Sequence, residues 1–219
     1  MKAETASTST KPRLRGASHQ AAFYAALGAG PMLVASTPTP QAAWTTAVYV
    51  VCLAALFGIS ALYHRPDWPP AMRQRMRRLD HSAIFLMIAG SYTPMLIFGL
   101  GLESGLSLLR WIWLGALAGI GKTLLWVRAP KVLNAALYLG FGWIAFAYLP
   151  AIGARGGPGV LCLLAAGGVI YSLGAVVYAL RWPDPDPRTF GYHEIFHACV
   201  ILAAFCHFLA ILRLSRLVP

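Results

Sequence analysis

The feature that most constrains this chain is a series of long apolar stretches separated by short polar or Pro/Gly-rich breaks. Seven stretches fall at about 20–36, 42–63, 80–100, 106–127, 132–152, 159–180 and 193–212. A helix needs about 20 mainly apolar residues to cross the roughly 30 Å hydrocarbon core of a bilayer. With 58% hydrophobic and 11% charged residues, the chain is unlike a soluble globule. We therefore predict an all-α polytopic membrane protein, with a seven-helix transmembrane bundle over residues 19–217.

Lysine and arginine are unevenly divided between the two sets of loops. Of the 18 basic residues, 14 fall on the side that carries the N-terminus. The positive-inside bias then predicts a cytoplasmic N-terminus and, after seven spans, a C-terminus outside. We interpret residues 1–18, which are polar and basic, as a disordered cytoplasmic tail. Because the charges lie in loops between spans, they favour anionic lipid over nucleic acid as a partner. The expected location is the cell (inner) membrane.

The loop at 65–78 concentrates five arginines together with Trp68 and two methionines. Such a segment is typical of chains that lie against anionic lipid headgroups, although it also serves as a simple topology signal. Both interpretations of the loop stay open at the level of sequence.

Ionisable side chains at span ends form a second pattern. They are costly to insert into a membrane, so each needs a reason to be there. The six that lie at corresponding depth are His19, His64, Asp80, His81, His193 and His197. The predicted topology puts all of them on the cytoplasmic side. Charge distribution and histidine position are independent features, and their agreement predicts a polar site near the cytoplasmic leaflet.

His193 and His197 are one helical turn apart and share a face, about 6 Å apart along the axis. The same spacing relates Ser60 to His64. Two such imidazoles can hold one divalent ion, and a third histidine from a neighbouring helix would leave one tetrahedral position for water, as in catalytic zinc sites. Asp80 could then accept a hydrogen bond from that water or orient an imidazole, and Ser60 could bind water or a substrate oxygen. For any single histidine, an interfacial hydrogen bond is the simpler interpretation.

Residues 193–197 also match the HExxH pattern of zinc metalloproteases, in which the glutamate is the general base. Glu194 points about 100° away from His193 on the helix, which favours a position facing solvent at the membrane boundary. His207 lies ten residues beyond His197, roughly 15 Å deeper, so we expect it to bond a neighbouring helix rather than the same metal.

Three motifs resemble those of a known family. Ser60-Ala-Leu-Tyr-His64, Arg78-Leu-Asp-His-Ser-Ala-Ile-Phe85 and Gly191-Tyr-His-Glu-Ile-Phe-His197 are similar to the hemolysin III family, which belongs with the progestin and adipoQ receptors. The resemblance covers nearly the whole chain from about residue 18. It implies a seven-helix bundle with a zinc ion (Zn2+) held by His64, His193 and His197. It also implies that Asp80 contacts the metal through water and that Ser60 lies close by.

The resemblance also bears on function, because members of the wider superfamily are thought to hydrolyse amide or ester bonds in lipids. Our first hypothesis is a zinc-dependent hydrolase that takes a membrane lipid into the bundle. The alternatives are a sensor or membrane-homeostasis regulator with structural zinc, and a pore-forming haemolysin. One departure concerns the N-terminal motif. Family members often carry an acidic residue and an asparagine shortly before the residue matched by His19, whereas Pro12 and Arg15 fall near those positions in this chain.

Overall fold

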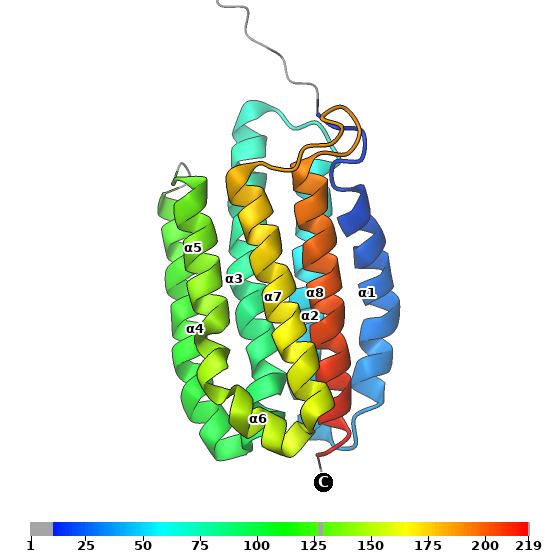
Figure 1. Cartoon of the computed structure of the whole chain (residues 1–219), viewed down its shortest axis with the longest axis vertical. Helices are drawn as coiled ribbons and strands as arrows, with labels where there is room; N and C mark the ends of the chain where they lie inside the picture. The colour runs from blue at the N-terminus through cyan, green and yellow to red at the C-terminus, as the bar shows by residue number, and fades with distance from the viewer. Residues whose placement is uncertain (1–10, 127–128, 219) are drawn as a thin grey trace, which may run out of the picture.

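The computed structural model describes residues 11–126 and 129–218, and every regular element in these two ranges is a helix. The elements are α1 (Ala17–Ala35), α2 (Pro40–His64), α3 (Pro70–Leu100), α4 (Leu102–Leu125), α5 (Lys131–Gly142), the 3₁₀ helix η1 (Trp143–Tyr148), α6 (Leu149–Gly156), α7 (Pro158–Leu180) and α8 (Tyr192–Ser215). The long helices lie side by side in one bundle (Figure 1). The all-α prediction is confirmed.

Within the described residues, six segments are long and apolar enough to cross a membrane, namely α2, α3, α4, the stretch 131–156, α7 and α8. The predicted first span forms α1, which packs against α2 and α8. Helix α1 has 19 residues but does not reach the same hydropathy, because polar residues such as His19 and Gln20 lower its average. The six other spans establish a multi-pass membrane bundle, and a membrane crossing by α1 stays a prediction.

Helix α3 begins well before the predicted span. The segment 65–78 was expected to be a loop, but only residues 65–69 lie outside helices and α3 starts at Pro70. Proline is well suited to the first helical position, and the Met, Arg and Gln residues that follow are good helix formers despite their polarity. At 31 residues, α3 is about 46 Å long, which exceeds the roughly 30 Å hydrocarbon core. Its first turns project beyond the neighbouring helix ends (Figure 1).

The predicted span at 132–152 is a broken helix made of α5, η1 and α6. The hydroxyl of Tyr92 on α3 fills the break: it donates to the Gly142 carbonyl oxygen at 2.7 Å and accepts from the Ala145 N–H at 2.6 Å. Backbone groups inside a bilayer must be satisfied by protein, because no water is available to them. Tyr92, which is 3% exposed, therefore lets a span change helix type within the membrane.

Replacing Tyr92 by phenylalanine is expected to destabilise the folded protein by about 1–2 kcal/mol, because it leaves the Ala145 N–H and the Gly142 carbonyl without their partner. Thermal unfolding in detergent measures the loss. Tyr24→Phe is the matched control, since the Tyr24 side chain is 62% exposed on α1. Equal melting temperatures for the two variants would show that the hydroxyl does not stabilise the break.

One end of the bundle, which we call the histidine end, gathers residues 11–16, 65–69 and 181–191 (Figure 1). The C-terminus lies at the opposite end. Residues 13–16 form a turn, and the backbone N–H of Arg13 donates to the carbonyl of Arg188 at 2.9 Å. Lys11 bonds Asp67 at 2.7 Å, and this hydrogen bond holds the pKa of the Asp67 carboxyl below its usual value. These contacts order the last part of the predicted tail, whose residues 1–10 lie outside the described residues.

Candidate metal centre

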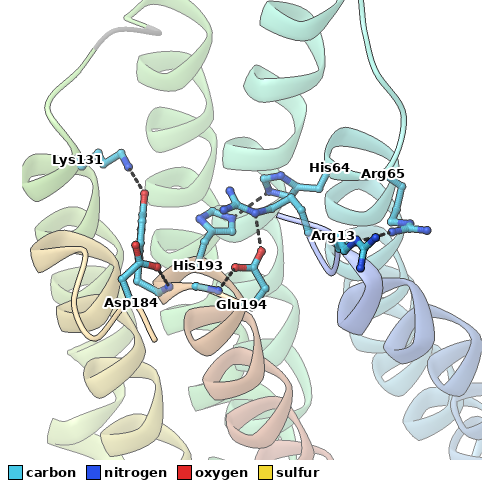
Figure 2. A network of polar contacts seen from close by, with 10 residues as sticks. Arg13, His64, Arg65, Lys131, Asp184, His193 and Glu194 are labelled. Carbon is cyan, nitrogen blue, oxygen red and sulfur yellow. Dashed lines mark hydrogen bonds and ion pairs between the residues drawn. The ribbon is translucent and has the colours of Figure 1, made fainter. Parts of the chain in front are cut away.

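Three histidines meet at the histidine end. His64 is the last residue of α2, and His193 and His197 lie in the first two turns of α8. Their ring nitrogens offer one set of three possible ligand atoms that all lie within 4.8 Å of one another. The Nε2 atoms of His64 and His193 are 3.2 Å apart, and Figure 2 shows these two rings meeting between the helices. This group could hold a metal ion.

The local sequence explains how α8 presents two ligands. The i and i+4 spacing puts His193 and His197 on one face, and their ring centroids are 4.5 Å apart. The helix starts after Gly191, whose N–H donates to the Glu194 carboxylate at 2.9 Å. A glutamate at the third helical position commonly accepts this bond. The start of α8, and with it the position of both imidazoles, is therefore fixed by a cap.

His19 and Ser60 form a second layer behind the three histidines. The His19 ring stacks on His197, with centroids 3.7 Å apart and planes 7° apart. Its Nδ1 atom and the Ser60 hydroxyl form a hydrogen bond of 2.8 Å. Both side chains are buried. Ser60 is therefore close to the centre, as expected, and His19 supports His197 although it does not belong to the group of three.

Asp80 and His81 lie eleven and twelve residues into α3. The Asp80 carboxylate is 3.4 Å from Nδ1 of His81, and both side chains are about 85% buried. Both residues line the cavity that His193 and His197 also line. The structure therefore brings the five predicted site residues to one end of the bundle, with Asp80 and Ser60 bordering the cavity.

The cavity has a volume of about 200 Å³ and extends through the middle of the bundle. It runs from His193 past His207 to Ile152, and of the long helices that the structure describes only α4 does not contribute to its wall. Most of the lining side chains are apolar. Phe146 on η1 lines it and is also 64% exposed, so the wall at η1 is part of the outer surface of the bundle. His207 lies deep in the cavity against Tyr171 of α7, with ring centroids 5.5 Å apart.

Glu194 is buried rather than facing solvent, so that expectation was wrong. Its side chain is 2% exposed and pairs with Arg15, with 2.5 Å between Nε and Oε1. One carboxylate oxygen thus bonds Arg15 and the other caps Gly191 (Figure 2). Glu194 is not among the residues that line the cavity, so the geometry does not favour it as a general base. Its place at the third position of a helix was the sequence signal for a capping role.

The segment before α1 closes over the centre through this ion pair. Gly16 has a φ of 78°, and a Cβ atom built there would lie 2.7 Å from the Cβ of His64. Only glycine suits both the left-handed backbone and the close approach. Arg15 and Gly16 therefore hold residues 11–16 directly against a predicted ligand.

Replacing Glu194 by glutamine is expected to lower stability by about 2 kcal/mol. Breaking a fully buried ion pair costs about 3–5 kcal/mol, and we discount this because the Arg15 side chain is 19% exposed. Asp67→Asn, which removes the exposed partner of Lys11, should change the melting temperature little. A metalloprotease would instead lose proteolysis with unchanged stability and metal content.

Comparison with known proteins identifies the family. A sequence model described as Haemolysin-III related matches residues 7–208, which is most of the chain. The chain belongs to the hemolysin III family. Hemolysin-3 of Bacillus cereus is 37% identical over 141 residues, which cover 64% of each chain. This chain therefore spans less than two thirds of the length of that relative.

Relatives in animals extend the match to the progestin and adipoQ receptor superfamily. The human monocyte to macrophage differentiation factor is 31% identical over 176 residues, or 76% of this chain and 68% of that protein. The adiponectin receptor protein of Drosophila melanogaster is 30% identical over 184 residues, or 73% and 39%. The family predicted from the three motifs is confirmed, and this hemolysin III protein is an integral, multi-pass membrane protein.

Proposed function

We propose that this hemolysin III protein is a zinc-dependent hydrolase that cleaves amide or ester bonds of lipids within the membrane. The observation that carries the proposal is a group of three histidines, two of which, His193 and His197, line one end of a mainly apolar cavity. Polar, convergent groups at the end of an apolar pocket are typical of a site that orients an amphipathic ligand.

The chemistry of the donors fits zinc. Imidazole nitrogens are common zinc ligands, and bonds of about 2.0–2.1 Å put two tetrahedral ligand atoms roughly 3.3 Å apart. The Nε2 atoms of His64 and His193 are 3.2 Å apart. Nδ1 of His197 is buried without a hydrogen-bond partner among the described residues, and a ligand bond would satisfy it. We assign His64, His193 and His197 as the ligands.

A bound zinc ion would supply Lewis acidity and make a nearby water more acidic. The chain supplies the remaining parts. Asp80 borders the cavity with a carboxylate that can accept a proton from water, and Nδ1 of His81 lies 3.4 Å from that carboxylate. Ser60 would orient a substrate oxygen or a water, since its hydroxyl also lines the cavity. The apolar wall would bind the hydrocarbon part of a lipid, which gains about 0.8 kcal/mol per buried CH₂ group.

The proposed orientation follows the basic residues. We place the histidine end at the cytoplasmic leaflet, with α1 as a seventh span and the C-terminus outside. The opposite placement of residue 11 and the C-terminus along the bundle supports an odd number of crossings (Figure 1).

The test is metal analysis of the purified full chain followed by turnover of a panel of lipid amides and esters. We expect about one zinc per chain, loss of turnover after chelation, and recovery on adding zinc. Zinc-loaded protein that turns over no lipid of the panel faster than the chelated protein would defeat the catalytic proposal.

The second candidate is a regulator in which zinc is structural. It is favoured by where the ligands lie in the chain, because a bound metal would cross-link the end of α2 to the start of α8. In that case the ligands would matter for stability while Asp80 would be dispensable. Pore formation is less favoured, because the cavity wall is mainly apolar.

A further inference from the structure

A second, smaller pocket lies at the histidine end between α3, α4 and α5. We call it the arginine pocket, and its lining residues are Arg77, Arg78, His81, Thr123, Trp126 and Asn134. Its volume is about 10 Å³, which is room for roughly one oxygen-sized atom. Unlike the cavity, it is lined almost wholly by polar or charged side chains.

Among the residues that the structure describes, the cations around this pocket have no anionic partner. Nε of Arg78 is buried and makes no hydrogen bond. Within residues 11–126 and 129–218, no carboxylate lies within ion-pair distance of Arg77, Arg78 or Lys122. Lys122 bonds only the neutral amide oxygen of Asn134, which itself lines the pocket. Arg78 is half-buried as a whole, but its buried Nε has no partner, and an anion in the pocket would satisfy it.

The pocket lies at the depth of lipid headgroups. Arg77 and Arg78 lie in the third turn of α3, beside the end of α4 and the start of α5. Trp126, at the end of α4, lines the pocket and is 52% exposed. Tryptophan is enriched at this level of the bilayer, because its ring is apolar and its N–H is polar. An occupant at this depth would therefore meet charged headgroups on one side and the bundle on the other.

We propose that the arginine pocket binds a phosphate group, with one phosphate oxygen entering between Arg77 and Arg78. Guanidinium groups match phosphate in charge and in their bidentate geometry, which favours phosphate over a spherical anion such as chloride. The pocket admits a single atom, so the rest of the group lies at its mouth beside Trp126. The phosphate could come from an anionic phospholipid or from solution. The proposal does not depend on zinc or on hydrolysis.

Neighbouring residues on α3 provide a sharp control. Arg73 and Arg75 belong to the same arginine-rich segment, but both are exposed and neither lines the pocket. A diffuse attraction between the segment and an anionic membrane would use all of these arginines about equally. A built site uses Arg77 and Arg78 selectively.

The experiment uses the full chain in a neutral detergent, with binding measured by native mass spectrometry and by thermal shift. Phosphatidylglycerol, phosphatidylcholine and inorganic phosphate are titrated separately against wild type, Arg75→Gln and Arg78→Gln. We expect Arg78→Gln to weaken phosphatidylglycerol binding about tenfold, as for loss of one charge-assisted hydrogen bond, and Arg75→Gln to change it less than about twofold.

The separate titrations distinguish the two sources of the phosphate. The same dependence on Arg78 with inorganic phosphate alone would assign the site to a free phosphate, and its restriction to phosphatidylglycerol would assign it to a lipid headgroup. Arg77→Gln provides an independent test if Arg78→Gln does not fold, and it should weaken binding to a similar degree. Equal loss in Arg75→Gln and the pocket variants, or no binding by wild type, would overturn the proposal.

Discussion

Replacing Asp80 by asparagine is expected to reduce lipid turnover by roughly 100- to 10,000-fold, the usual contribution of a general base. Asparagine keeps the shape of the side chain but cannot accept the proton. Asp80 does not belong to the group of three proposed zinc ligands, so the zinc content of the variant should equal that of wild type. Turnover in detergent micelles, with zinc measured on the same sample, separates the two effects.

Asp67→Asn is the control for that substitution, because it makes the same chemical change on an exposed loop of the histidine end. It should leave turnover unchanged. If Asp80→Asn with full zinc content turned over lipid as fast as wild type, the assignment of Asp80 would be wrong. Unchanged cellular function of that variant would favour the regulator with structural zinc.

Replacing His197 by alanine is expected to abolish zinc binding and activity together. The substitution removes one of three ligands and also the ring on which His19 stacks. A metal present at 100 to 1,000 times its Kd stabilises the folded state by about 2.7–4.1 kcal/mol, and this stabilisation would be lost. Zinc analysis and melting temperature, each with and without added zinc, measure the two losses.

His207→Ala is the matched control for His197→Ala. It removes a second, half-buried imidazole from the same helix, roughly 15 Å farther along α8. It should retain zinc and its response to added zinc. If His197→Ala melted at the wild-type temperature in zinc-replete detergent, the result would contradict both a catalytic and a structural metal at this position.

Much of the fold could be predicted because hydropathy alone separates the spans of a membrane protein. Hydropathy failed to predict the structure where helix propensity or a contact between helices decides it. The start of α3 was missed because arginines lower hydropathy while favouring a helix. The break at η1 was missed because its partner, Tyr92, comes from another helix about 50 residues away in sequence.

The same contrast holds for the candidate site. The pair His193 and His197 follows from helical spacing, whereas the choice of His64 as third histidine came from family resemblance. The ion pair between Arg15 and Glu194 joins residues 179 positions apart, and no local pattern indicates it.

The exposed wall at η1 has a kinetic consequence. Phe146 and Trp143 border the cavity and also face outward, so a substrate could reach the histidines sideways without leaving the bilayer. The effective concentration of such a substrate is its mole fraction in the leaflet. Adding buffer to a suspension of vesicles would leave the velocity per enzyme unchanged, whereas adding inert lipid within the same vesicles would reduce it.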